Sequence, residues 1–374
     1  MISPSTFHDL VSGRRRGPAA ALARVALRAA AAPYGWAIAR RNRQFDRQAV
    51  EIARPSVPVI SVGNLTVGGT GKTPMVQWVA ALCRRREVRV AILSRGYGAA
   101  ADGRNDEALE LELALPDVPH LQNPNRAESA MVAVGELGSQ LLLLDDGFQH
   151  RRLARDFDIV LLDASEPFGY GRLLPAGLLR EPVGALARAH AVVLSRADML
   201  DAAGRDAIRR RVAALNPHAA WCEVEHRPAA LVSAEGVRAP RARIEDDGRG
   251  TDAGAPSLAG KRVAAFCGIG NPAGFRHTLR GLGCEVLAWR EFPDHHAYQR
   301  DDVESITAWA RDAGAELVLC TRKDLVKLRA GSVGGVPLRA VGVELQFLRG
   351  APELTAALEP LIRQAIAVPD LADV

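Results

Sequence analysis

Apolar residues along this chain gather into short unbroken runs, which alternate with longer stretches of helical periodicity. Short apolar runs bounded by polar positions favour strands that are buried on both faces. The strands predicted from these runs, including polar residues at several of their ends, span 89–94, 140–145, 158–163, 190–195, 262–267 and 317–320. The residues 59–62, apolar on either side of Ser61, are predicted as a further strand. Because helical segments separate the strands, the pattern predicts an α/β fold with a mostly parallel sheet flanked by helices.

The composition changes between two such α/β patterns, and the chain is long enough for two domains. Residues 238–257 are rich in charged residues, glycine and proline. A second pattern of strands and helices begins after them. We therefore predict an α/β domain over 46–228, a linker or insertion over 229–258, and a smaller α/β domain over 259–374.

The N-terminal segment has a pattern of its own. Residues 18–39 are rich in alanine, with Arg24 and Arg28 on one helical face and Pro33 breaking the run. The arginines make this segment too polar to span a bilayer and unlike the apolar core of a signal peptide. We predict a basic amphipathic helix within residues 1–45. It either lies in the headgroup layer of an anionic membrane or packs on the body of the protein with its arginines in water.

Charge is distributed unevenly along the chain. The net charge of the 374 residues is +5, but residues 1–50 contain nine arginines, no lysine and two aspartates. A basic N-terminal segment on an otherwise near-neutral chain indicates that the protein binds an anionic partner, either a membrane or a nucleic acid. Aromatic residues are not interleaved with the arginines, so we expect no nucleic-acid partner. The five cysteines are odd in number and lack zinc-ligand spacing, which indicates reduced thiols.

The strongest chemical signal is the stretch 59–74, VISVGNLTVGGTGKTP. A strand runs into a glycine-rich loop, then into Lys72 and Thr73, then into an apolar helix, which is the order of a phosphate-binding loop. Glycine lets backbone N–H groups approach phosphate oxygens, and a helix N-terminus favours their negative charge. Lys72 can reach the β- and γ-phosphates of ATP, and the Thr73 hydroxyl can bind Mg²⁺. The predicted ATP-binding residues are Thr66, Val67, Gly68, Gly69, Thr70, Gly71, Lys72 and Thr73.

Two aspartates end the second strong signal, the stretch 140–150 (QLLLLDDGFQH). The four leucines predict a buried strand, and Asp145 and Asp146 at its end are costly unless they bind something. An aspartate in this place helps to hold Mg²⁺ in phosphate-loop enzymes, so we predict that Thr73 shares the metal with one or both aspartates. The alternative is a turn stabilised by the two aspartates and the glycine that follows them.

Other candidate residues lie at strand ends and helix starts. Tyr97 is in a turn after the run 89–94, and Arg180 is in a loop where it can meet an anion. Asp106 begins a helical pattern, a place where aspartate is commonly a cap. The sequence Asp-His-His at 294–296 precedes another helix. A histidine supported by a carboxylate suits proton transfer, and a plain surface turn is equally consistent with this pattern.

Seven stretches of the chain match the motifs of a known family. In order they are VGNLTVGGTGKTP, LSRGYG, LLDDGFQHRRLARDFDIVLLDA, LLPAGLLREP, FCGIGNPAGF, FPDHHAY and TRKDLVK. The set resembles the tetraacyldisaccharide 4'-kinase family over residues 15–350, and Thr66, where the general loop pattern has glycine, is typical of that family. The implied fold is of the P-loop NTPase type, with a second smaller α/β domain and an N-terminal amphipathic helix.

The resemblance also implies a reaction and a location. The reaction is ATP- and Mg²⁺-dependent phosphorylation of the 4'-hydroxyl of a tetraacylated glucosamine disaccharide 1-phosphate, a step of lipid A biosynthesis. The location is the cytoplasmic face of the bacterial inner membrane, where the protein would be peripheral. The basic N-terminal segment, analysed from its residues alone, agrees with this location.

Individual residues receive roles from the same resemblance. The family's catalytic pair corresponds to Asp106 and His295, although the local sequence is NDEA here where the family has GDEP. Such a pair takes the proton from the sugar hydroxyl as it attacks. The two residues fall in different predicted domains, so domain closure would complete the site. Contacts to the acceptor or to phosphate are implied for Tyr97, Arg126, Gln149, His150 and Arg180.

Two other functions fit parts of the pattern. A nucleotide-hydrolysing switch or assembly factor would share the phosphate loop, but it should also carry a base-reading Asn-Lys-x-Asp loop. Residues 195–198 and 321–324 approach this loop pattern, and both lack the asparagine. A nucleic-acid-binding ATPase would explain the arginines but not the missing aromatic residues. We expect ATP, Mg²⁺, a lipid disaccharide and a membrane surface as partners, with no obligate protein partner.

Overall fold

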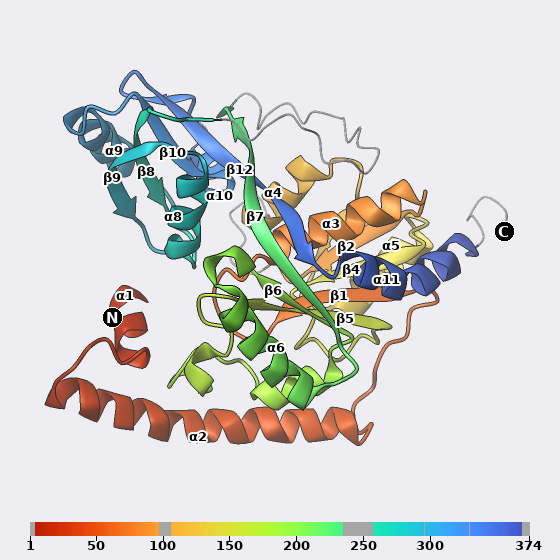
Figure 1. The fold of residues 1–374 in the computed structure, drawn as a ribbon. Helices are drawn as coiled ribbons and strands as arrows, with labels where there is room; N and C mark the ends of the chain where they lie inside the picture. The colour runs from red at the N-terminus through yellow and green to blue at the C-terminus, as the bar shows by residue number, and fades with distance from the viewer. Residues whose placement is uncertain (1–3, 97–105, 235–256, 295, 329, 369–374) are drawn as a thin grey trace. The chain divides into compact units, whose positions relative to one another are not determined.

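A computed structural model of the chain describes residues 4–96, 106–234, 257–294, 296–328 and 330–368. Strands and helices alternate along most of it, as the apolar runs predict (Figure 1). The elements are α1 (Pro4–Val11), α2 (Pro18–Asp46), β1 (Val59–Asn64), α3 (Lys72–Arg85), β2 (Val90–Ser94), α4 (Asp106–Ala114), β3 (His120–Gln122), α5 (Arg126–Gly135), β4 (Leu141–Asp145), β5 (Phe157–Asp163), 3₁₀ turns at Gly169–Gly171 and Val183–Arg188, β6 (Ala191–Ser195), a 3₁₀ turn at Ala197–Met199, α6 (Ala202–Leu215), β7 (Ala220–Val232), β8 (Arg262–Cys267), α8 (Pro272–Gly281), β9 (Glu285–Glu291), α9 (Arg300–Asp312), β10 (Leu317–Thr321), α10 (Arg322–Leu328), β11 (Ser332–Val333), β12 (Val336–Arg349) and α11 (Ala351–Ile366). The predicted α/β class, with mostly parallel strands, is confirmed.

The described residues form two compact units. Unit 1 comprises 4–95, 121–224 and 347–368, and unit 2 comprises 96, 106–120, 225–234, 257–294, 296–328 and 330–346. Three segments are grouped differently from the predicted domains, and the first of them is 4–45, which belongs to unit 1. The helix α4 belongs to unit 2, where it packs against α10. The last helix, α11, belongs to unit 1, where Glu359 pairs with Arg86 at 3.1 Å.

The sheet of unit 1 is built around β1. Its strand order is β2-β4-β1-β5-β6-β7, with parallel pairing throughout. On one side of β1, Val62 lies opposite Asp145 of β4, and on the other side Asn64 lies opposite Leu161 of β5. The carboxyl ends of β1 and β4 therefore meet at one edge, which is the edge where open α/β sheets bind ligands.

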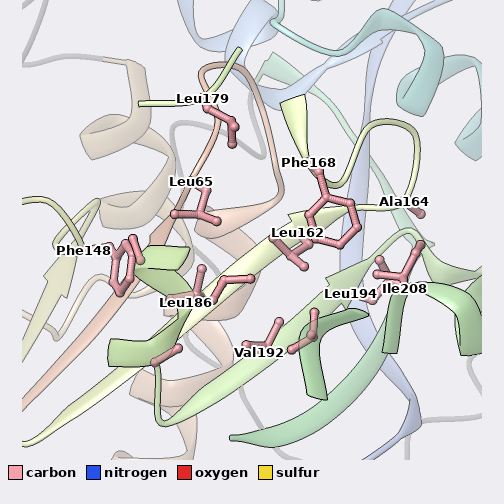
Figure 2. Close-up of a cluster of buried hydrophobic side chains, with 14 of the residues drawn as sticks. Leu65, Phe148, Leu162, Ala164, Phe168, Leu179, Leu186, Val192, Leu194 and Ile208 are labelled. Atoms are coloured by element: carbon pink, nitrogen blue, oxygen red, sulfur yellow. The ribbon is translucent and has the colours of Figure 1, made fainter. Parts of the chain in front are cut away.

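Both faces of this sheet are buried, as the unbroken apolar runs predict. All residues of β1, β2, β4, β5 and β6 are buried. On one face, the side chains of a single apolar cluster come together, among them Leu65, Phe148, Leu162 and Leu186 (Figure 2). Leu65 and Phe148 belong to the loops that follow β1 and β4. The close-packed core therefore reaches these two loops and restrains them.

Unit 2 has its own parallel sheet, in the order β12-β10-β8-β9. The fully buried carboxylate of Asp324 lies among the strand ends of this sheet. It accepts hydrogen bonds from the hydroxyls of Tyr298 (2.9 Å) and Thr321 (2.6 Å), and from the N–H of Gly268 (3.0 Å). Residues 321–324, which approach a base-reading pattern, therefore have a structural role, because the carboxylate of Asp324 accepts these hydrogen bonds within unit 2.

The helix α2 is longer than the sequence pattern predicts. It runs without interruption from Pro18 to Asp46, so the prediction that Pro33 breaks the run is wrong (Figure 1). A proline inside a helix removes one hydrogen bond, but the alanines around it are the strongest helix formers. Over the part of the chain that the structure describes, no helix combines the length and the apolar character needed to cross a membrane.

Candidate active site

The loop between β1 and α3 ends with the backbone geometry of a phosphate-binding loop. Gly71 precedes α3 with a φ of 85°, a left-handed conformation that glycine adopts without strain. Lys72 and Thr73 are the first two residues of the helix. The N–H groups in the first turn of a helix have no carbonyl partner within it, so this helix start is suited to binding an anion.

The residue before Gly71 is held from two sides. The side-chain amide of Asn64 donates to the hydroxyl of Thr70 (2.9 Å), and the Ser195 hydroxyl donates to the Thr70 carbonyl oxygen (2.7 Å). All three side chains are buried. Because Ser195 is the last residue of β6, the stretch 195–198 that approaches a base-reading pattern begins with an anchor for the phosphate loop.

The first part of the loop pairs with a second segment of unit 1. Residues 65–67 and 178–180 are joined by an antiparallel bridge between Thr66 and Leu179 and by backbone hydrogen bonds on either side of it. Thr66 is buried in this pairing, which explains why a threonine can replace the usual glycine. The same pairing fixes the backbone of Arg180, so that its guanidinium reaches the end of β4.

The two aspartates at the end of β4 have different surroundings. Asp145 ends the strand and is only 3% exposed. Asp146 has a φ of 55°, a left-handed conformation that aspartate adopts more readily than most residues, and its side chain is 34% exposed. The next position requires glycine, because a Cβ on Gly147 would lie 2.6 Å from the hydroxyl oxygen of Ser61. This tight turn leaves the carboxylate of Asp146 facing the phosphate loop.

Ion pairs through Asp146 connect the phosphate loop to Arg180. The carboxylate lies 3.4 Å from the ammonium of Lys72 and accepts hydrogen bonds of 2.8 and 2.9 Å from Arg180 Nη1. Burial raises the pKa of Asp146, but the two cations outweigh burial and lower it to about 2. Gln149 extends the network, since it accepts from Arg180 (3.2 Å) and donates to the carbonyl oxygen of Asn64 (2.8 Å).

A cavity of about 550 Å³ adjoins this network and has a strongly cationic lining. Its wall includes Asp146, Gln149 and His150 together with Arg41, Arg95, Arg126, Arg151, Arg152 and Arg180. Guanidinium groups bind phosphate through paired hydrogen bonds and remain charged at every physiological pH. A concave surface with this excess of guanidinium groups is therefore suited to an anionic ligand that carries phosphate.

Two groups in the cavity wall can bond to a polar ligand. Burial and the nearby guanidinium groups of Arg126 and Arg155 lower the pKa of His150 to about 4, so its ring is neutral at pH 7. Within the described residues, the buried Nε2 of His150 and the buried Nε of Arg126 have no hydrogen-bond partner. Leaving such atoms unsatisfied costs free energy, which a ligand with oxygen atoms would recover.

The residues at the end of the phosphate loop fit a magnesium ion. Mg²⁺ prefers oxygen ligands and commonly takes one or two carboxylates together with phosphate oxygens of the substrate. Thr73 offers a hydroxyl at the start of α3, and Asp145 and Asp146 offer carboxylates at the adjacent strand end. The donor set is therefore appropriate for Mg²⁺ bound together with a nucleotide.

Three predicted site residues are not part of this geometry. Tyr97 and His295 lie outside the described residues, and Asp106 begins α4 in unit 2 with its side chain undescribed. Next to position 295, His296 Nε2 lies 2.9 Å from the carboxylate of Asp302. In the described part of the Asp-His-His motif, the histidine supported by a carboxylate is therefore His296.

Unit 1 brings the other predicted residues together. Lys72, Asp146, Gln149 and Arg180 form one network, and the adjoining cavity has Arg126 and His150 in its wall. The residues of this site that no sequence pattern singled out are Asn64 and Ser195, which hold the phosphate loop, and the cavity arginines Arg41, Arg95, Arg151 and Arg152. Asn64 and Ser195 each end a strand of the nucleotide edge, and this position was the available signal. No pattern separated the cavity arginines from arginines exposed to solvent.

The chain is similar to proteins of one family over almost its whole length. The family model for tetraacyldisaccharide-1-P 4'-kinase matches residues 23–363. A tetraacyldisaccharide 4'-kinase from Anaeromyxobacter sp. (strain K) is 44% identical over 370 residues, covering 94% of each chain. A protein of the same name from Geobacter sulfurreducens is 36% identical over 374 residues, covering 95% of this chain and 98% of the relative. The crystal structure of LpxK from Aquifex aeolicus in complex with ATP matches with a TM-score of 0.65 at 27% identity, covering 91% of this chain and 99% of that one.

Proposed function

This chain belongs to the tetraacyldisaccharide 4'-kinase family, and we propose that its catalytic machinery is the ionic network and cationic cavity of unit 1. The reaction is ATP-dependent phosphorylation of the 4'-hydroxyl of tetraacyldisaccharide 1-phosphate, which gives the 1,4'-bisphosphate precursor of lipid A (lipid IVA). One observation carries the assignment of the site. The ammonium of Lys72 meets the carboxylate of Asp146 at 3.4 Å, at the end of a phosphate loop and beside an arginine-lined cavity.

The phosphate loop binds the triphosphate of ATP. The backbone from Gly68 to Thr73 surrounds the phosphate oxygens, and the start of α3 contributes its N–H groups. Lys72 neutralises charge on the β- and γ-phosphates, exchanging part of its contact with Asp146 for phosphate oxygens. Phosphoryl transfer depends chiefly on such positioning and charge stabilisation, because the protein has little covalent chemistry to perform.

Thr73 and one or both of Asp145 and Asp146 would hold Mg²⁺ when nucleotide is present. When bound there, the ion would supply positive charge that offsets the negative charge developing on the transferred phosphate. Arg180 donates hydrogen bonds to the carboxylate of Asp146. Its two hydrogen bonds keep Asp146 ionised and fixed in the orientation that faces the loop.

The cationic cavity binds the phosphorylated head of the acceptor. Arg126 and His150 supply the unsatisfied buried atoms, and Gln149 and Arg180 connect the cavity to the ionic network. Tyr97 is assigned to the acceptor by family resemblance. The same resemblance supports Asp106 and His295 as the pair that takes the proton of the 4'-hydroxyl as its oxygen bonds to the γ-phosphorus. The bond between that phosphorus and the bridging oxygen of ATP breaks, and ADP leaves.

A transfer assay tests this function directly. The purified chain is incubated with γ-labelled ATP, Mg²⁺ and tetraacyldisaccharide 1-phosphate in detergent micelles, and the products are separated by chromatography. The label should appear in the lipid and should depend on the acceptor. Label that appears as inorganic phosphate at the same rate without acceptor would instead support a nucleotide-hydrolysing switch.

The N-terminal half of α2 presents the surface that we propose for membrane binding. Leu22 and Val25 are 72% and 58% exposed, unusual values for large apolar side chains. Arg24 and Arg28 lie on the same helix and can meet anionic headgroups. Family resemblance supports the cytoplasmic face of the bacterial inner membrane as the surface that is bound, with the protein held peripherally.

Leu22→Ser combined with Val25→Ser should weaken binding to vesicles of phosphatidylglycerol and phosphatidylethanolamine by about tenfold or more. Burying one such side chain in an apolar medium contributes about 1.5–3 kcal/mol. Co-sedimentation at several vesicle concentrations measures the loss. Met131→Ser is the matched control, because Met131 is an exposed apolar residue of α5 in the same unit. Equal co-sedimentation of the double variant and the wild type would exclude this surface.

A further inference from the structure

The C-terminal half of α2 differs from its exposed N-terminal half. The less exposed positions of this half recur at helical spacing, at 34, 35, 38, 39, 41, 42 and 45. The positions between them, such as 36, 37, 40 and 43, are exposed. Phe45 is buried. One stripe of this half therefore packs against the rest of unit 1, as an amphipathic helix does on a core.

Polar groups along this stripe bond to the segments that form the Asp146 network. The Tyr34 hydroxyl donates to the carbonyl oxygen of Arg180 at 2.9 Å. Arg41 donates to the carbonyl oxygen of Gln149. One position further along the helix, the side-chain amide of Asn42 donates at 3.1 Å to the buried carboxylate of Glu181.

Contacts from other segments of unit 1 fix the position of this stripe along the helix axis. Arg151 donates to the carbonyl oxygen of Asn42 (3.3 Å) and to the carboxylate of Asp46 (2.7 Å), and its guanidinium lies 5.2 Å from the centre of the Phe45 ring. At Gly35 the helix lies so close to the 169–179 loop that an added Cβ would be 3.1 Å from Leu173. The contact therefore has a defined fit along three turns of the helix.

Arg180 and Gln149 need this support because they lie in loops. Neither residue is in a helix or a strand, and their side chains must meet Asp146 within hydrogen-bond distance. A catalytic group carried on a loop loses precision unless a second layer of contacts fixes it. The helix supplies such contacts to the backbone of both residues.

We propose that residues 34–46 of α2 are a positioning element of the kinase site. Tyr34 and Arg41 bond to the backbone carbonyl oxygens of Arg180 and Gln149, and Asn42 bonds to the side chain of the adjacent Glu181. The side chains of Gln149 and Arg180 then hold Asp146. The proposal rests on the proposed function of the ionic network. It separates two roles within one helix, with membrane contact in the N-terminal half and alignment of the site in the C-terminal half.

The test measures turnover under conditions in which membrane attachment is not needed. Tyr34→Phe combined with Asn42→Ala removes two of the three bonds and retains the aromatic ring of residue 34. With acceptor dispersed in detergent micelles, kcat should fall roughly tenfold, since each lost hydrogen bond changes a rate by a factor of about three to ten. Vesicle binding should stay at the wild-type level. Ala37→Ser, on the exposed side of the same helix, is the matched control and should change neither quantity.

Further measurements separate alignment from loss of structure. The active fraction is counted by the stoichiometry of ATP binding, so that kcat refers to folded sites only. Wild-type kcat in the double variant overturns the proposal, and so does a loss of kcat that equals the loss of folded protein. If the double variant does not fold, Tyr34→Phe alone decides, with an expected loss of about threefold. If the wild type transfers no phosphate to the acceptor, it is the proposed function that fails.

Discussion

Replacing Lys72 with alanine should reduce kcat/KM for phosphoryl transfer by about a thousandfold or more, because a charge that stabilises the transition state in a desolvated site is worth several kcal/mol. The ammonium of Lys72 is nearly buried at the start of α3, so water would replace it poorly. Arg180 does not take over its role, since its guanidinium is already bonded to Asp146 and Gln149.

The fold should survive this substitution. Asp146 keeps its pair with Arg180, so the turn after β4 retains a cation against its carboxylate. Lys261→Ala is the matched control, because Lys261 is exposed and its ammonium forms a surface ion pair with Glu316. The kcat/KM values come from label transfer, and circular dichroism with thermal unfolding reports the fold. Wild-type-like turnover in the Lys72 variant would refute the assigned role.

The sheet of unit 1 could be predicted because its strands are buried on both faces. Such strands are apolar along most of their length, which is why 141–144 and 159–162 stand out as runs. The domain boundaries could not be predicted in the same way. The unit that α4 or α11 joins is decided by packing between distant segments, which a local pattern does not record. The continuity of α2 through Pro33 is a similar case, because contacts made by Tyr34 and its neighbours hold the second half of the helix.

Some residues of the site could be predicted from a local motif, and others could not, because they meet only through contacts between distant segments. Lys72 and Thr73 follow from a local motif, in which glycine, lysine and hydroxyl must occur at fixed spacing. Ser195 is 125 residues from Thr70 in sequence, and no local pattern connects the two. The near matches to a base-reading loop, which lack its asparagine, have internal contacts instead: Ser195 bonds to Thr70, and Asp324 accepts a hydrogen bond from Tyr298. Residue type at a strand end therefore locates the nucleotide edge better than it assigns roles within it.

Asp146→Asn should lower kcat by about a hundredfold to a thousandfold, the range found when one stabilising group is removed from a charged transition state. Asparagine keeps the shape of the side chain and tolerates the φ of 55° at this position, so the turn should persist. The lost charge has two opposing consequences. With the proposed role of Asp146 in holding Mg²⁺, its loss weakens metal binding, so activity should require a higher Mg²⁺ concentration. Lys72 and Arg180 lose their counter-ion, so ATP without metal should bind at least as tightly as in the wild type.

Calorimetric titration with ATP, in the presence and absence of Mg²⁺, measures both consequences. Asp206→Asn, on the exposed side of α6, is the matched control and should behave as the wild type does. Weaker binding of metal-free ATP by the Asp146 variant would contradict the view that this carboxylate neutralises the two cations.

The same substitution should change how the free energy of unfolding depends on pH. The pKa of Asp146 is about 2 in the folded chain, below the value of about 3.9 for an unfolded aspartate. Its ionised form therefore stabilises the folded state above about pH 4, and this contribution is lost as the pH falls toward 2. Asparagine makes no such contribution at any pH. In denaturant titrations the wild type should be more stable than Asp146→Asn at pH 7, and the difference should shrink below pH 4. A difference that stays constant down to the acid limit of folding would mean that Asp146 is not held by Lys72 and Arg180.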